Sequence, residues 1–219
     1  MISHKHKFIF ISPPKTGSTS LMHPLVPYAN IKKIIEQPQW NTFDFYEHVS
    51  DFKQEIWNTF TKKKRSSDPR KHSNLDSYPE KHIENYQIFC AIRNPFERIL
   101  SMWKWEKSVK GIFQGVDYRK LNFDQFLYNH TMDWYFKPQY EFIYTDSIDM
   151  NCINLIRFEN LQQDFNLACD KIGITRKLLP HSNKTKHKHY TEYYDDETRE
   201  IIAQKYARDI EYFGYKFGE

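Results

Sequence analysis

The sequence predicts an α/β fold, in which one domain spanning residues 1–219 contains a parallel β-sheet with helices on both faces. Short apolar runs typical of buried strands alternate along the chain with segments of helical periodicity. Two of these runs, at 7–11 and 87–92, lead through a loop into a helix start, as strands of parallel sheets do. The length suits one domain with a substantial core, and no internal repeat divides it.

The first strand is expected at 7–11, where four of the five residues favour strands, and two prolines then end it. A helix can begin at Ser18, which leaves Lys15 and Gly17 in a short loop between them. Free backbone N–H groups and the positive end of the helix dipole converge at such a point, and Lys15 adds a full charge. The segment 12–20 therefore predicts a site for a phosphate or sulfate ester.

This loop makes the sheet P-loop-like, but its spacing differs from that of nucleotide triphosphatases. Their pattern, G-x-x-x-x-G-K-[ST], places lysine after the second glycine and beside a hydroxyl that holds magnesium. Here Lys15 precedes Gly17, and no glycine lies upstream in the loop, which argues against a magnesium–ATP site. A nucleotide or small-molecule kinase stays open as an alternative, because it would share the strand–loop–helix start. An ordinary strand-to-helix turn with a solvated lysine is the plainest alternative.

Between the two strand–loop–helix segments, residues 44–60 have apolar side chains at helical spacing and predict a helix. The basic, polar stretch 61–77 contains Pro69 and is expected to be a mobile loop. Its run of basic residues at 62–65 leaves a second alternative open, a non-catalytic protein that holds polyanions. The run lacks interleaved aromatic residues, which favours a solvated loop.

The second strand–loop–helix segment spans 87–108, with Arg93 at the end of the strand. Three residues suit the N-cap, the first helical position and the capping-box acid: Asn94, Pro95 and Glu97. The helix that follows has an apolar stripe at i, i+3, i+4 and i+7, and Ser101 lies on its opposite, polar side. An arginine at a strand end and a serine two turns along the next helix suit a second phosphate. Surface ion pairs are the plainer alternative for both Arg93 and Arg98.

The remaining elements follow from the same signals. They are expected as a short helix at 123–128, strands at 142–145 and 152–157, a helix capped by Asn160 that ends at Gly173, a lysine- and histidine-rich loop at 181–190, and a final helix at about 196–212. In parallel sheets, ligands bind at the carboxyl ends of the strands, and both predicted phosphate segments lie there.

These segments together resemble the sulfotransferases that use 3′-phosphoadenosine 5′-phosphosulfate (PAPS), particularly the carbohydrate-type, sulfotransferase family 2-like branch. The sequence P-K-T-G-S-T-S at 14–20 is similar to the family's 5′-phosphosulfate loop. The stretch 93–101 is similar to its 3′-phosphate motif, R-[ND]-P-[FYW]-x-R-x-x-S, which is the more specific of the two. The sequence R-F-E-N-L at 157–161 looks like a strand-end segment of the family. The resemblance runs from about residue 8 to the end and is weak at 21–85.

The resemblance implies a role for each of these segments in binding PAPS. The 5′-phosphosulfate would be held by a run of adjacent loop residues: Pro14, Lys15, Thr16, Gly17, Ser18, Thr19 and Ser20. Lys15 would also stabilise the leaving oxygen during in-line transfer, while Arg93 and Ser101 hold the 3′-phosphate. A loop at 180–190 would cover the cofactor and bring Lys184 to a phosphate. A sulfuryl group carries less negative charge than a γ-phosphoryl group, so lysine and amide donors suffice without a metal.

An acceptor hydroxyl needs a general base, and histidine is the usual choice near neutral pH. The stretch 70–75 resembles a "KHST"-like stretch of bacterial relatives, in a region that contributes the base in related enzymes, which implies His72 as a catalytic residue. A solvated loop histidine is the plainer alternative. Four rivals for the base remain: Glu36, Glu47, His48 and Glu55.

The acceptor is expected to be a carbohydrate hydroxyl, because the resembled branch modifies sugars. In addition, aromatic residues make up 17% of the chain and can stack on pyranose faces. The same comparison implies that residues 137–139 line the acceptor groove. His181, His187 and His189 lie without the cysteines or carboxylates that usually complete a zinc site, so no metal is expected.

Composition restricts the partners and the compartment. A formal charge of +4 favours an anionic cofactor or acceptor without implying a nucleic-acid partner. No apolar run approaches the ~18 residues needed to cross a bilayer, and the basic N-terminus leads directly into the phosphate loop rather than into a signal peptide. Cys90, Cys152 and Cys169 are odd in number and lie in apolar surroundings, which predicts buried, reduced thiols and a cytoplasmic location.

Overall fold

The computed structural model describes residues 1–29, 72–109, 112–113, 116–130, 137–180 and 188–219. Its centre is a four-stranded sheet in the order β1, β2, β3, β6. These strands span Ile2–Ser3, Phe8–Ile11, Gln87–Ile92 and Asn154–Arg157. β2, β3 and β6 are parallel, whereas β1 pairs with β2 in the antiparallel direction. The predicted α/β class is confirmed, and β1 adds an antiparallel edge strand that no sequence pattern predicted.

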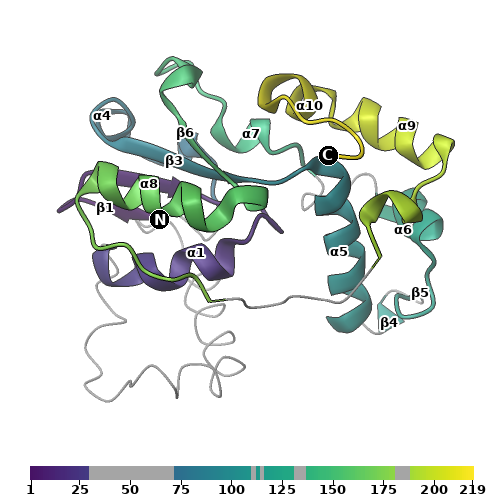
Figure 1. Ribbon diagram of the computed structural model, residues 1–219. Helices are drawn as coiled ribbons and strands as arrows, with labels where there is room; N and C mark the ends of the chain where they lie inside the picture. The colour runs from purple at the N-terminus through teal and green to yellow at the C-terminus, as the bar shows by residue number, and fades with distance from the viewer. Residues whose placement is uncertain (30–71, 110–111, 114–115, 131–136, 181–187) are drawn as a thin grey trace.

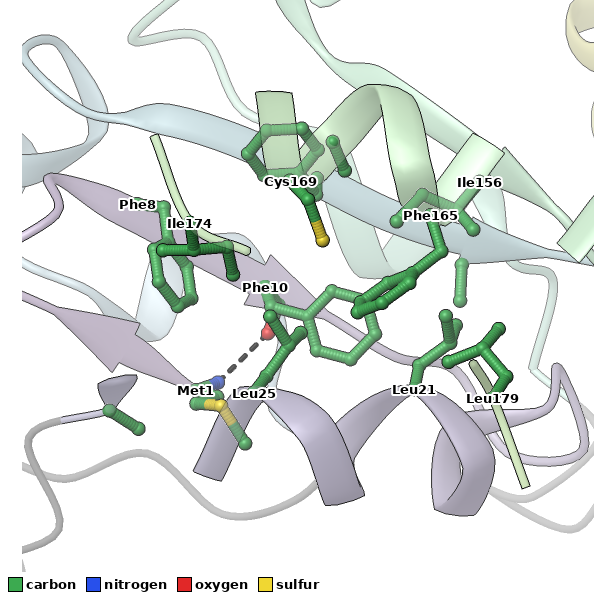
Figure 2. Packing of buried hydrophobic residues seen from close by; sticks show 14 residues of the cluster. Met1, Phe8, Phe10, Leu21, Leu25, Ile156, Phe165, Cys169, Ile174 and Leu179 are labelled. Atoms are coloured by element: carbon green, nitrogen blue, oxygen red, sulfur yellow. Dashed lines mark hydrogen bonds between the residues drawn. The ribbon is translucent and has the colours of Figure 1, made fainter. Parts of the chain in front are cut away.

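On one face of the sheet, α1 (Ser18–Leu25) and α8 (Leu161–Ile172) cover the strands (Figure 1). Figure 2 shows Phe8 and Phe10 of β2 packed in this layer, together with Phe165 of α8. Both β2 phenylalanines point the same way because successive side chains of a strand alternate between its faces. This cluster anchors the helix that follows the predicted phosphate loop.

The opposite face takes the other two residues of β2, Ile9 and Ile11, which are both buried. They join a second apolar cluster with residues of α7 (Tyr140–Ile143) and α10 (Ala207–Phe213), including Phe213. Helices therefore lie on both faces, as predicted (Figure 1). β2 and the stretch 88–92 of β3 are continuously apolar and buried, as expected for strands covered on both faces.

A third apolar cluster lies beyond the carboxyl ends of the strands, around α5 (Pro95–Val109), α6 (Phe123–His130) and α9 (Asp196–Lys205) (Figure 1). Phe96 of α5 and Ile202 of α9 are both buried in it. The smaller elements are α4 (Glu80–Ile83), β4 (Ile112–Phe113), β5 (Val116–Asp117) and 3-10 turns at Val26–Tyr28, Leu75–Ser77, Met150–Cys152, Phe158–Asn160 and Tyr190–Tyr193.

The predicted strand at 142–145 is wrong, because α7 occupies this part of the chain. The backbone N–H groups of Gln139 and Tyr140 each donate a 2.8 Å hydrogen bond to the carboxylate of Asp209. A carboxylate at the start of a helical turn satisfies N–H groups that have no partner within the helix. Asp209 lies about seventy positions further along the chain, so local sequence patterns do not reveal it.

The final helix predicted at 196–212 is found as two helices, α9 and α10, which break at Tyr206. Tyr206 is fully buried, with φ −108° and ψ 25°, values outside the helical range. The strand predicted from 152 begins at Asn154, after a 3-10 turn. The helix predicted after Asn160 is confirmed as α8, and Gly173 ends it in the left-handed conformation.

Three predictions lie wholly or mostly outside the described residues. The helix at 44–60 lies wholly outside them, and the lysine- and histidine-rich loop at 181–190 is described only from 188 onwards. The basic loop 61–77 is described only from 72 onwards, where Leu75 begins a 3-10 turn and is fully buried. Within the described ranges, no helix is long and apolar enough to cross a membrane.

All three cysteines are free thiols, as predicted. Cys90 and Cys169 are buried, and burial raises the pKa of both, that of Cys169 to about 11. Cys152 is exposed, which corrects the prediction for this residue. It lies in the 3-10 turn before β6, where its side chain has not yet entered the sheet.

Candidate active site

The loop between β2 and α1 contains two residues with positive φ. Lys15 and Gly17 both adopt the left-handed conformation, with φ 69° and φ 81°. Left-handed residues in a tight turn bring neighbouring N–H groups to one side, which forms a concave site for an anion. For Lys15 this conformation costs about 1–2 kcal/mol, since its Cβ crowds the following carbonyl oxygen.

The four hydroxyl-bearing residues of this loop differ in their surroundings: Thr16, Ser18, Thr19 and Ser20. The Thr16 hydroxyl donates to the carbonyl of Pro13 at 2.8 Å and is fully buried, so it stabilises the turn itself. The Ser20 hydroxyl donates to the carbonyl of Pro180 at 2.9 Å, which fixes α1 to the chain just before the 181–187 stretch. Ser18 is buried at the start of α1, and Thr19 is exposed. The Thr16 and Ser20 hydroxyls therefore donate within the protein, at Pro13 and Pro180.

Position 17 favours glycine for two reasons: its φ is positive, and the side chains of Phe158 and Leu161 lie close to its Cα. A Cβ atom at this position would lie 3.0 Å from Cδ2 of Phe158 and 3.3 Å from Cδ2 of Leu161. Phe158 follows β6, so this contact brings the ends of β2 and β6 together. Phe158 also lies under the guanidinium of Arg93, whose Cζ is 3.8 Å from the ring centroid.

Replacing Gly17 with alanine is expected to destabilise the fold by about 2–3 kcal/mol, from left-handed strain and from the clash with Phe158. Gly173→Ala is the matched control, because Gly173 has φ 66° and a Cβ added there would meet no atom within 4 Å. Urea denaturation of both variants measures the difference. Equal losses in the two variants would show that the Phe158 contact is not tight.

Arg93 joins the second predicted phosphate segment to the first. It follows β3, is almost fully buried, and its Nη1 donates to the carbonyl of Lys15 at 3.3 Å. The same guanidinium pairs with Glu97, with Nη2 at 3.2 Å from Oε1 and Nε at 3.3 Å from Oε2. Since β2 and β3 are parallel and in register, their carboxyl ends bring the two segments to one edge of the sheet.

One side of α5 faces this loop along its length. Glu97 contacts Arg93 near the start of the helix, and the Lys15 ammonium lies 5.1 Å from the ring centroid of Trp105 two turns later. Ser101 lies four residues from each and therefore on the same side of α5. The structure thus brings Lys15 and Arg93 into contact and places Ser101 on the side of α5 that carries Glu97 and Trp105.

His72 lies against the beginning of the same loop. Its Nδ1 is 2.6 Å from the carbonyl oxygen of Ser12, the residue that follows β2. A carbonyl oxygen only accepts hydrogen bonds, so Nδ1 carries the proton. In the neutral ring the lone pair is then on Nε2, which is the form a general base requires.

The start of α5 differs from the predicted capping box. Asn94 is the N-cap, and its Oδ1 accepts from the N–H of Phe96 at 3.1 Å, but Glu97 pairs with Arg93 instead of returning to the cap. The backbone N–H of Asn94 donates to Glu159 at 2.7 Å. The sequence patterns assigned no role to Glu159 or Phe158, although the R-F-E-N-L motif contains both.

Several predicted site residues lie outside the described ranges. They are Lys184, the alternative bases Glu36, Glu47, His48 and Glu55, and two of the three histidines considered for a metal, His181 and His187. The third, His189, is exposed beside the Thr191 hydroxyl. Among the residues that the structure describes, no group of histidine, cysteine and acidic side chains is arranged to hold a metal ion.

The expectation that residues 137–139 line an acceptor groove is wrong for Gln139. Its side chain is fully buried and hydrogen-bonds to the backbone of Arg93 at both ends of the amide. The carbonyl of Lys137 accepts a hydrogen bond from Arg98 at 3.0 Å. Gln139 therefore supports the site from inside the protein, whereas Lys137 and Pro138 are half-buried.

The chain matches the family model described as Sulfotransferase family over residues 1–216. Comparison with curated proteins and with solved structures found no match. Because the family match covers nearly the whole chain, the protein belongs to the sulfotransferase family, whose members transfer sulfuryl groups.

Proposed function

We propose that this protein transfers a sulfuryl group from PAPS to an acceptor hydroxyl, as an enzyme of the EC 2.8.2 type. The observation that carries the proposal is the hydrogen bond of 3.3 Å from Arg93 to the carbonyl of Lys15. It holds two basic segments at one edge of the sheet. PAPS has an anionic group at each end of its ribose, and such a pair of cationic segments suits both.

The loop residues at 14–20 would hold the 5′-phosphosulfate, with the left-handed backbone at Lys15 and Gly17 directing amides to it. Arg93 and Ser101 would hold the 3′-phosphate. Lys184 would add a further phosphate contact from the loop at 180–190. Bidentate recognition by a guanidinium is the strongest of these contacts, since it matches the geometry of a phosphate group.

When bound, PAPS supplies an activated sulfuryl group with PAP as its leaving group. His72 would accept the proton of the acceptor hydroxyl at Nε2 while that oxygen forms its bond to sulfur. Lys15 would stabilise the negative charge that develops on the bridging oxygen as the sulfur–oxygen bond breaks. The hydrogen bond to Ser12 would hold the His72 ring in the basic tautomer throughout.

A carbohydrate acceptor is part of the proposal. Trp105 supports it, because this aromatic side chain is 38% exposed and lies beside the Lys15 ammonium. An exposed indole offers a flat apolar surface on which a pyranose ring can stack. The free thiols support a reducing, cytoplasmic location.

The test has a binding step and a chemical step. Isothermal titration calorimetry with PAP in the presence of EDTA is expected to show binding, and ATP with magnesium is expected to show no turnover. Mass spectrometry after incubation with PAPS and a glycan pool is expected to show products heavier by one sulfuryl group. ATP-dependent phosphorylation would favour the kinase alternative. PAP binding without any sulfated product from glycan or metabolite pools would favour a purely binding role.

Glu97 is expected to weaken nucleotide binding, because its carboxylate occupies the guanidinium that a 3′-phosphate needs. Glu97→Gln should therefore tighten PAP binding by about fivefold, or roughly 1 kcal/mol for removing one partly exposed charge. Asp170→Asn is the matched control. Asp170 lies on α8 and forms a surface ion pair with Arg176, so this substitution removes the same charge away from the site. Calorimetry that finds equal PAP affinities for Glu97→Gln and the wild type would contradict the competition.

A further inference from the structure

Arg98 is a fully buried arginine within the predicted 3′-phosphate segment 93–101, and two of its hydrogen bonds go to backbone carbonyls. Its Nε donates to the carbonyl of Pro14 at 2.9 Å, directly before Lys15. Its Nη1 donates to the carbonyl of Lys137 at 3.0 Å. Burial lowers the pKa of Arg98, while the nearby Tyr206 and Asp209 raise it. A guanidinium placed in this way fixes the orientation of the peptide that begins the phosphate loop.

Asp209 of α10 is the buried carboxylate that interacts electrostatically with this guanidinium. It accepts hydrogen bonds from the backbone N–H of Gln139 and Tyr140, both at 2.8 Å, and from Nε2 of Gln139 at 3.2 Å. Burial raises the pKa of Asp209, and the charge of Arg98 and these donors lower it. Three donors on one carboxylate restrict the position of Gln139 tightly.

Gln139 completes the connection to the second phosphate segment. Its Oε1 accepts from the backbone N–H of Arg93 at 2.8 Å, and its Nε2 donates to the carbonyl of the same residue at 2.9 Å. The side chain therefore pairs with Arg93 as another strand would, at the point where β3 ends. The position of the Arg93 backbone is set by a residue that Asp209 holds.

We propose that Arg98, Gln139 and Asp209, here called the buried brace, are positioning residues that set the separation of the two anion sites. Arg98 holds the start of the loop at Pro14, and Gln139 holds the backbone of Arg93. All three side chains are buried, so the brace acts on a ligand through these two backbones. The proposal rests on the proposed function, because a fixed separation matters only for a ligand with anionic groups at both ends.

The proposal separates ligands that use both sites from ligands that use one. PAP would engage the loop and Arg93 together, whereas 5′-AMP would engage the loop alone. A change in the separation of the sites therefore weakens PAP more than 5′-AMP. A substitution that only lowers the free energy of unfolding, in a protein still folded at the assay temperature, does not weaken PAP binding more than 5′-AMP binding.

The experiment compares Gln139→Met and Asp209→Asn with the wild type by calorimetry with PAP and with 5′-AMP. Ile83→Val is the stability control, because Ile83 is buried and lies in α4, before the amino end of β3 and therefore at the end of the sheet away from both anion sites (Figure 1). In both brace variants PAP affinity is expected to fall about tenfold, or about 1.4 kcal/mol, and 5′-AMP affinity by less than about twofold. In Ile83→Val both affinities are expected to stay unchanged. Equal losses for PAP and 5′-AMP, or no loss, in the folded brace variants would overturn the proposal.

Hydrogen exchange of the wild-type protein, with and without PAP, provides a second test that does not depend on whether a variant folds. Saturating PAP is expected to slow hydrogen exchange in peptides covering α7 and α10, because Gln139 and Asp209 connect these helices to the backbone of Arg93. Unchanged exchange in both peptides would count against the brace. A wild type that binds no PAP would contradict the proposed function instead, and the brace is then judged by the free protein. In that case faster exchange of loop 12–20 in Gln139→Met supports the brace, and unchanged exchange overturns it.

Discussion

Replacing Lys15 with methionine is expected to lower kcat for sulfuryl transfer by about 10²–10³-fold, or about 3–4 kcal/mol, the usual effect of removing one donor from a developing oxyanion. Methionine keeps most of the apolar stem and has the same left-handed strain, since any L-residue other than glycine has a similar penalty at φ 69°. The fold and the left-handed backbone of the loop should therefore be retained. The KM for PAPS should change less than kcat, because the charge acts mainly on the leaving oxygen.

Lys107→Met is the control for this variant. Lys107 belongs to α5, and its ammonium lies 4.8 Å from the ring centroid of Trp103. The Lys15 ammonium lies in a similar position, 5.1 Å from the ring centroid of Trp105. Lys107→Met therefore loses a similar cation–π contact without touching the loop after β2. Steady-state kinetics with PAPS and calorimetry with PAP compare the two. A kcat for Lys15→Met equal to that of Lys107→Met would remove Lys15 from the chemical step.

The parts of the site that sequence alone predicted are those built from neighbouring residues. An apolar strand, a proline stop and a helix start follow one another within 8–20, and the structure has β2, the loop and α1 there. The same holds for β3 and α5 on either side of Arg93. Parallel pairing then brings the two strand ends to one edge without further information.

The parts that could not be predicted depend on contacts between distant residues. The carboxylate of Asp209 accepts from the N–H groups at the start of α7, about seventy positions earlier in the chain, and α7 includes the first two residues of the apolar run at 142–145. Glu159, rather than Glu97, accepts from the backbone at the start of α5, over a separation of 65 residues. Local strand and helix preferences do not reveal Asp209 or Glu159 as partners, because these preferences reflect only residues that are neighbours in the sequence. Tertiary contacts therefore decided the elements that the sequence patterns left ambiguous.

Replacing His72 with asparagine is expected to lower kcat by about 10²–10⁴-fold, the usual contribution of a general base, and to leave the affinity for PAP unchanged. The Nδ2 of asparagine can take the place of Nδ1 and donate to the carbonyl of Ser12, so the contact with the loop is retained. What the variant lacks is a nitrogen lone pair at the position of Nε2. His82→Asn is the matched control, because His82 belongs to a separate cluster with His4 and Tyr86.

The dependence of kcat on pH separates a base from a residue that only orders the loop. In the wild type, kcat should fall on the acid side of the pH profile, because the protonated ring accepts no further proton. In His72→Asn this fall should disappear, while His82→Asn should keep it. If His72→Asn retained full activity and the wild-type pH profile, the base would be sought among Glu36, Glu47, His48 and Glu55. Loss of activity with an unchanged pH profile would instead make His72 a support for Ser12 and the loop that follows it.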